Sequence, residues 1–250
     1  MDLFSIKTIK SILQAQGIRP RKGLGQNFLI SKGVLGDILK TANLKTSDTV
    51  LEVGPGIGTL TRQLAQYAGG VIAVEKDPAM VEILKETTKD LSNIEVIHGD
   101  ILSFPKPGLG APKPGLGNLG KTYKVVANLP YYITSPVIRL FLETENRPKL
   151  LVLMVQKEVA QRICAKPRTR TSSVRGMPPM NLLAVSVQFY AKPEIISYVK
   201  KDCFWPQPKV DSAIIKITPI AADINADARG FFKIVKAGFK QPRKQLLNNL

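Results

Sequence analysis

The 250-residue sequence predicts an α/β fold, with a mostly parallel sheet that carries helices on both faces and has an antiparallel edge. Between residues 50 and 155, short apolar runs rich in valine and isoleucine alternate with helix-like stretches, which is typical of strands buried on both faces. Two later segments, 181–190 and 210–218, alternate between apolar and polar residues, as antiparallel strands do. We therefore expect one domain over 1–219 and a small, partial helical domain over 220–250.

Composition narrows the classes of function. The 36 lysine and arginine residues outnumber the 19 aspartate and glutamate residues, and the net charge of +17 favours a polyanionic partner, above all nucleic acid. No run of ~18 apolar residues predicts a membrane helix, and the N-terminus lacks the apolar core of a signal peptide. Cys164 and Cys203 are isolated and His98 is the only histidine. We therefore expect a cytoplasmic protein without a disulfide, a membrane anchor or a metal site.

A strand over 50–53 leads through a glycine turn into a helix. The turn contains Gly54, Gly56 and Gly58, where a ligand can lie against bare backbone at a helix N-terminus. Its spacing is G-x-G-x-G followed by Thr59, which departs from the dinucleotide-binding fingerprint. The spacing resembles the first motif of S-adenosylmethionine (SAM) methyltransferases. A generic tight turn between strand and helix is the alternative.

Acidic residues follow the next two strands. Glu75 ends the strand over 70–75, where a carboxylate is placed to accept hydrogen bonds from ribose hydroxyls. NAD enzymes use the same device, so Glu75 indicates an adenosine-type ligand without choosing which one, and a surface glutamate is the alternative. Asp100 follows the strand over 94–97 and faces the expected ligand crevice. It is placed to accept a hydrogen bond from an adenine amino group, unless it only caps the following turn.

Two other segments stand out. Residues 23–29, G-L-G-Q-N-F-L, combine glycines, amides and large apolar residues as ordinary loops rarely do, and we expect the amides to cover a bound ligand. Residues 105–120 contain a duplicated P-K-P-G-L-G sequence, which we interpret as an insertion without chemistry. Apolar spacing predicts further helices at 3–16, 33–43, 78–90 and 136–145.

A fourth strand, 123–127, brings the sequence N-L-P-Y to the same edge of the sheet. The exocyclic amino group of adenine is a poor nucleophile because its lone pair is delocalised into the ring. The Asn128 side-chain oxygen and the Pro130 carbonyl can accept its two N–H groups, so that orientation carries catalysis without a strong base. Tyr131 and Phe204 are expected to stack on the two faces of the base. A turn that merely ends the strand is the alternative.

Together these motifs resemble the KsgA-type ribosomal RNA adenine N6,N6-dimethyltransferases, which are similar to the erythromycin-resistance 23S rRNA methyltransferases. The matching segments are 23–29, 52–61, 74–77, 99–102, N-L-P-Y-Y-I-T-S-P at 128–136, and F-W-P-Q-P-K-V-D-S at 204–212. The last two point to the small-subunit branch. The resemblance implies a SAM-dependent methyltransferase (Rossmann-like) fold, with SAM contacts at Asn27, Leu29, Gly54, Gly56, Glu75, Asp100, Ile101 and Asn128.

The resemblance also implies a function. The expected reaction is dimethylation of the N6 amino groups of two adjacent adenines in the 3′-terminal hairpin of 16S rRNA, by a monomer acting on the 30S subunit or its precursor. The basic segments at 19–22, 162–175 and 233–244 are expected to hold RNA. Residues 166–180 are longer and more basic than the family pattern, and the family continues through further helices, so the helical domain is expected to be truncated. The alternatives are a 23S rRNA adenine methyltransferase, a non-catalytic RNA-binding assembly factor and, disfavoured by Thr59, a dehydrogenase.

Overall fold

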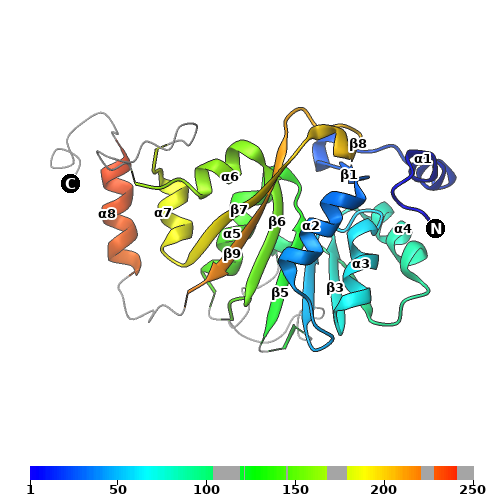
Figure 1. Cartoon of the computed structure of the whole chain (residues 1–250), viewed down its shortest axis with the longest axis horizontal. Helices are drawn as coiled ribbons and strands as arrows, with labels where there is room; N and C mark the ends of the chain where they lie inside the picture. The colour runs from blue at the N-terminus through cyan, green and yellow to red at the C-terminus, as the bar shows by residue number, and fades with distance from the viewer. Residues whose placement is uncertain (104–118, 121, 145, 168–178, 221–227, 241–250) are drawn as a thin grey trace.

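A seven-stranded sheet organises the computed structural model, which describes residues 1–103, 119–120, 122–144, 146–167, 179–220 and 228–240 (Figure 1). Its strands are β2 (Thr49–Val53), β3 (Gly70–Glu75), β4 (Ile94–His98), β5 (Tyr123–Asn128), β6 (Leu150–Gln156), β7 (Ala191–Val199) and β9 (Ser212–Pro219). In the order β4-β3-β2-β5-β6-β9-β7, the first five strands are parallel and β9 is antiparallel to both of its neighbours. The predicted mostly parallel sheet with an antiparallel edge is confirmed.

The strand order reverses beside β2, and this reversal positions the candidate site. After β2 the chain moves outward through β3 and β4, and then returns to place β5 on the other side of β2. The connections after β2 and β5 therefore leave the sheet in opposite directions. A crevice opens at such a point beyond the carboxyl ends of the strands, and open α/β sheets bind their ligands there.

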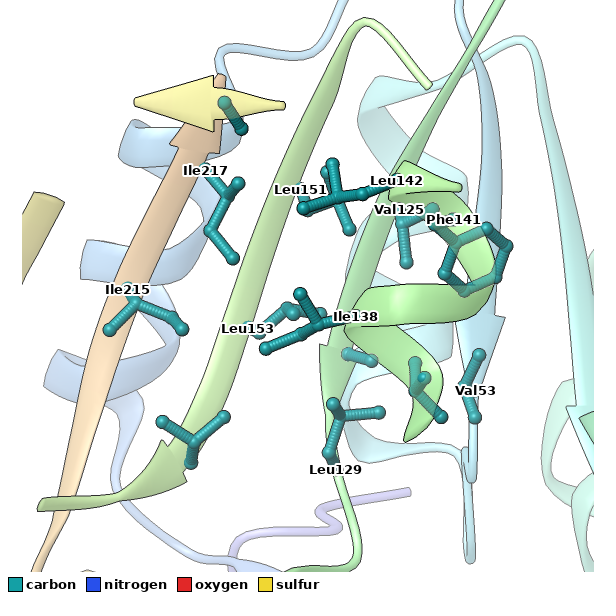
Figure 2. Packing of buried hydrophobic residues seen from close by; sticks show 14 of the residues in the cluster. Val53, Val125, Leu129, Ile138, Phe141, Leu142, Leu151, Leu153, Ile215 and Ile217 are labelled. Carbon is teal, nitrogen blue, oxygen red and sulfur yellow. The ribbon is translucent and has the colours of Figure 1, made fainter. Parts of the chain in front are cut away.

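Helices cover both faces of the sheet, as predicted (Figure 1). They are α1 (Ile6–Ala15), α2 (Lys32–Ala42), α3 (Thr59–Tyr67), α4 (Pro78–Thr88), α5 (Thr134–Leu142), α6 (Lys157–Ile163), α7 (Leu182–Gln188) and α8 (Ala228–Lys240). Alternate residues of a strand point to opposite faces. In β6, Leu151 and Leu153 pack with α5, α6 and α7, whereas Val152 and Met154 pack with α2 and α3. Figure 2 shows the first of these layers, with Ile138 of α5 near both leucines.

The prediction of a strand over 181–190 is wrong. The Asn181 side chain accepts a hydrogen bond from the backbone N–H of Ala184 at 3.1 Å and so caps the start of α7. Ala184 and Val187 are buried three residues apart, on one side of that helix. The antiparallel edge strand is the next segment, β7. It tolerates Pro193 because the outermost strand needs fewer backbone N–H donors.

The C-terminal helix α8 packs against the end of the sheet domain, far from α1 (Figure 1). The ring centroids of Phe231 and Phe232 lie 4.5 and 5.2 Å from that of Phe189. The predicted domain division after residue 219 stays a prediction. The P-K-P-G-L-G duplication before residue 119 and the basic stretches at 168–175 and 241–244 lie outside the described residues. No helix in the described part of the chain is long and apolar enough to cross a membrane.

Candidate active site

A cleft that is partly open to solvent lies at the carboxyl ends of β2, β3, β4 and β5. Residues 24–29 line it from outside the sheet; the last two of them form β1 (Phe28–Leu29), which pairs antiparallel with β8 (Phe204–Trp205). The structure brings together at this cleft all the residues predicted to contact SAM: Asn27, Leu29, Gly54, Gly56, Glu75, Asp100, Ile101 and Asn128.

Two glycines allow the backbone to approach Pro130 closely. Gly54, directly after β2, has a φ of +69°, and a Cβ atom there would lie 3.2 Å from the Pro130 Cδ atom. Gly25, in the segment that lines the outside of the cleft, has a φ of +65°, and its Cβ would lie 3.3 Å from the Pro130 Cβ atom. Any side chain at either position would be strained and crowded. The N-L-P-Y turn is therefore held between the glycine turn and the N-terminal segment.

Glu75 joins the glycine turn to the end of β3. Its Oε2 atom accepts a hydrogen bond from the Gly56 N–H at 3.0 Å, and its Oε1 atom accepts one from the Asp77 N–H at 2.9 Å. Burial raises the pKa of this carboxyl, while both backbone hydrogen bonds oppose the rise. Because a carboxylate offers about four acceptor positions, Glu75 keeps acceptor capacity toward the cleft. Its predicted ribose contact stays a prediction.

Asp100 has a partner on each of its carboxylate oxygens. The Lys76 ammonium donates to Oδ2 at 2.8 Å, and the Leu102 N–H donates to Oδ1 at 3.0 Å within the short helix η2 (Ile101–Ser103). The hydrogen bond from Lys76 lowers the pKa of Asp100, so the carboxylate stays charged. Asp100 thus caps the following turn and also lines the cleft, and its predicted hydrogen bond with an adenine amino group stays a prediction.

Glu52 lines the cleft but is not among the residues predicted from the sequence to contact SAM. It is 1% exposed, and its Oε2 atom has no hydrogen-bond partner among the described residues. Burial raises its pKa to about 8, the Thr61 hydroxyl opposes this rise, and the nearby Glu75 charge adds to it. Thr59 also lines the cleft, and its hydroxyl is buried without a partner among the described residues. A glutamate inside the apolar strand run V-L-E-V was the signal that could have identified it.

The N-L-P-Y turn presents two acceptors. The Asn128 Nδ2 group donates to the Asn27 carbonyl at 3.1 Å, which leaves the side-chain oxygen as the acceptor, and the described residues offer it no donor. The Pro130 carbonyl accepts from the Ile133 N–H at 3.1 Å and has a second lone pair. The Tyr131 hydroxyl and the Ser212 hydroxyl lie 2.7 Å apart, which ties the turn to β9.

The aromatic residues are placed differently from the prediction. Phe204 does not line the cleft: it is 3% exposed, pairs with Leu29 and packs in the core with α2 and α3. Its predicted stacking on the target base stays a prediction. Tyr131 is half-buried and does not line the cleft either, whereas Tyr132 lines it and is 52% exposed. Tyr132 directly follows Tyr131 in the N-L-P-Y-Y sequence but is not among the site residues predicted from it.

Known proteins resemble this chain along most of its length. Residues 17–250 match the family described as ribosomal RNA adenine dimethylase. Ribosomal RNA small subunit methyltransferase A of Dehalococcoides mccartyi is 48% identical over 243 residues, which cover 96% of this chain and 78% of the relative. The protein of the same name from Alkaliphilus oremlandii is 41% identical over 250 residues, with coverages of 98% and 82%.

Two solved structures share the fold. A dimethyladenosine transferase from Plasmodium falciparum superposes with a TM-score of 0.72 and 30% identity, and the match covers 88% of this chain and 74% of that one. The 23S rRNA methyltransferase ErmE gives a TM-score of 0.69 and 28% identity, with coverages of 89% and 83%. The first is named a dimethyladenosine transferase and the second a 23S rRNA methyltransferase, so the α/β methyltransferase fold predicted from the sequence is confirmed.

Proposed function

Because the chain belongs to the ribosomal RNA adenine dimethylase family, we propose that it transfers methyl groups from SAM to the N6 atoms of two adjacent adenines in the 3′-terminal hairpin of 16S rRNA. One observation carries the proposal: the Asn128 amide lies at the cleft with its nitrogen bonded to the Asn27 carbonyl and its oxygen available to accept. We further propose that the enzyme is a monomer that acts in the cytoplasm on the 30S subunit or its precursor.

The residues of the cleft fit SAM. The glycine turn after β2 lines the cleft at Gly54 and Gly56 with backbone that carries no side chain, so a ligand can lie against it. Glu75 and Asp100 supply carboxylate acceptors for the hydroxyl and amino groups of an adenosine. Glu52 contributes a buried oxygen without a partner, which suits the ammonium group of the methionine part. When bound, SAM supplies an electrophilic methyl group on a sulfonium sulfur.

The chain's own task is to orient the adenine amine. The Asn128 side-chain oxygen and the free lone pair of the Pro130 carbonyl accept the two N–H groups, which favours localisation of the lone pair on nitrogen. The hydrogen bond from Asn128 to Asn27 fixes which end of the amide faces the substrate. After one methyl transfer the amine keeps a single N–H, and either acceptor can hold it. Orientation of this kind can lower a barrier substantially without a strong base.

A methylation map distinguishes this function from its alternatives. Separate 30S and 50S subunits lacking adenine dimethylation would be incubated with the protein and SAM carrying a labelled methyl group. Primer extension would then locate the modified adenines, and a reaction without protein serves as the control. We expect label on two adjacent adenines near the 3′ end of 16S rRNA. Label in 23S rRNA would support the resistance-type activity, and binding without label would support a non-catalytic assembly factor.

A further inference from the structure

A second groove lies beside the cleft, between the C-terminal half of α1, the turn that follows it, and Trp205 in β8. Lys10, Gln14, Ile18, Arg19 and Trp205 are among the residues that line it. It contains no residue predicted to contact SAM or the target amine. Arg19 belongs to the basic segment 19–22 that is expected to hold RNA, and Trp205 belongs to the motif at 204–212, but the proposed reaction assigns no role to the groove that they share.

The end of α1 is built to place Arg19 in this groove. Gly17 has a φ of +65°, the Ile18 N–H donates to the Leu13 carbonyl at 2.8 Å, and the Gly17 N–H donates to the Gln14 carbonyl at 3.0 Å. This pair of hydrogen bonds is a Schellman motif, which reverses the chain at a helix C-terminus. Leu13 is 2% exposed and anchors the helix in the core, so the position of Arg19 is defined by a packed element.

Trp205 connects the groove to the cleft. Its ring stacks on that of Phe28, with centroids 6.4 Å apart and an angle of 23° between the planes. Phe28 in turn lines the cleft, where a Cβ atom on Gly56 would lie 3.3 Å from the Phe28 Cε1 atom. The Lys10 ammonium lies 5.7 Å from the centroid of the Trp205 ring. The two aromatic residues therefore form a common wall between the groove and the cleft.

The charges of the groove favour a polyanion. No acidic residue lines it, and neither Lys10 nor Arg19 has an ion-pair partner within the described residues. Arg21, two residues beyond Arg19, has a side chain that is 61% exposed and that lies 3.6 Å from Asp77. An aromatic platform beside unpaired cations is the arrangement that binds single-stranded nucleic acid, because bases stack on the ring and phosphates meet the cations.

We propose that this groove holds a nucleotide of the rRNA that lies outside the cleft, with its base against Trp205 and its phosphates at Lys10 and Arg19. The proposal rests on the proposed function and extends it, because it names where the substrate strand is held beside the target adenine. The exposed contact between Lys10 and the indole is weak. The incoming base replaces it, and Lys10 moves to a phosphate.

The test compares four variants in binding to 30S subunits that lack adenine dimethylation, at several salt concentrations. Trp205→Ala removes the platform and should weaken binding about 5- to 150-fold, whereas Trp205→Phe should retain most of the affinity. Lys10→Gln with Arg19→Gln should reduce the slope of log affinity against log salt by about 1.4, since each phosphate contact on a single strand contributes about 0.7. The matched control is Lys40→Gln with Lys45→Gln, on exposed residues near the amino end of β2, and it should leave the slope unchanged.

SAM affinity, measured by calorimetry, shows whether each variant keeps an intact cleft. If Trp205→Ala disturbs Phe28 and abolishes SAM binding, the 30S affinity of Trp205→Phe and the salt slope of the Lys10/Arg19 double variant still test the groove assignment. Wild-type affinity and salt slope in the Lys10/Arg19 double variant, together with active dimethylation by the wild type, would overturn the groove assignment and leave the proposed function intact. A wild type that neither binds nor methylates 30S or naked 16S rRNA would overturn both.

Discussion

Replacing Glu52 by glutamine should change how the stability of the protein depends on pH. Glu52 is almost fully buried, its Oε2 atom lacks a partner within the described residues, and burial raises its pKa from the ordinary value of 4.5 to about 8. A carboxyl whose pKa is raised on folding holds its proton more tightly in the folded chain. Its contribution to stability is therefore complete below about pH 4.5 and is lost as the pH rises through about 8.

The size of the effect follows from the two pKa values of Glu52. One pKa unit corresponds to about 1.4 kcal/mol, so the full span from 4.5 to about 8 corresponds to roughly 5 kcal/mol. Between pH 6 and pH 9 the wild type should lose about 3 kcal/mol through this site, because over most of that window the unfolded chain has lost the proton that folded Glu52 still holds. The Glu52→Gln variant has no proton to lose there. Because the charges of Glu52 and Glu75 interact, the difference between the two proteins includes the loss of that interaction.

Urea unfolding at pH 6, 7, 8 and 9 measures this difference directly, without SAM. The free energy of unfolding of Glu52→Gln minus that of the wild type should increase by about 3 kcal/mol from pH 6 to pH 9. Parallel curves for the two proteins would show that Glu52 is already ionised at pH 6 in the folded chain. In that case the argument from its unpartnered, buried oxygen would be wrong.

Two further predictions concern Glu75 at the cleft and Phe141 in the hydrophobic core. Glu75→Ala should weaken SAM binding about 10- to 150-fold in calorimetry, since it removes the carboxylate that accepts from the Gly56 N–H. The control Glu75→Gln should weaken SAM binding less. Unchanged SAM affinity in Glu75→Ala would show that Glu75 does not contact the ribose. Phe141→Ala should lower the free energy of unfolding by about 3–5 kcal/mol in urea, because the ring is 1% exposed and meets Tyr123 edge-on at 6.4 Å; a loss below about 1 kcal/mol would contradict this account of the core.

The parallel part of the fold is predictable from the sequence because its strands are buried on both faces. The run Val50–Val53, the strand that ends at Glu75 and the run before Asn128 are mostly apolar and buried, and each is followed by a polar or glycine turn. A ligand crevice at the carboxyl ends of such strands follows from the order of the elements alone. For this reason the predicted SAM-contacting residues lie at one cleft.

The antiparallel edge is less predictable because its pattern is decided by partners that are distant in sequence. The segment at 181–190 has both helical and strand-like spacing. The Asn181 side chain accepts a hydrogen bond from the Ala184 N–H, and this cap stabilises the helix. The burial of Phe204 depends on its pairing with Leu29, which lies more than 170 residues earlier. Which of Tyr131 and Tyr132 faces the cleft is likewise settled by the hydrogen bond between Tyr131 and Ser212 in β9. The contacts of Phe204 and Tyr131 leave no local signal, whereas the Asn181 cap is a local feature of the sequence.

Single-turnover methylation at saturating SAM and 30S substrate tests most directly whether Asn128 orients the target amine. Asn128→Ala removes the accepting oxygen, and we expect its transfer rate to fall on the order of 10²–10³-fold while RNA affinity changes little, since phosphate contacts dominate binding. Asn128→Asp keeps an acceptor oxygen and should retain more of the rate. If Asn128→Ala transfers methyl groups at the wild-type rate, the amide does not position the amine, and the turn at Asn128 does no more than end β5.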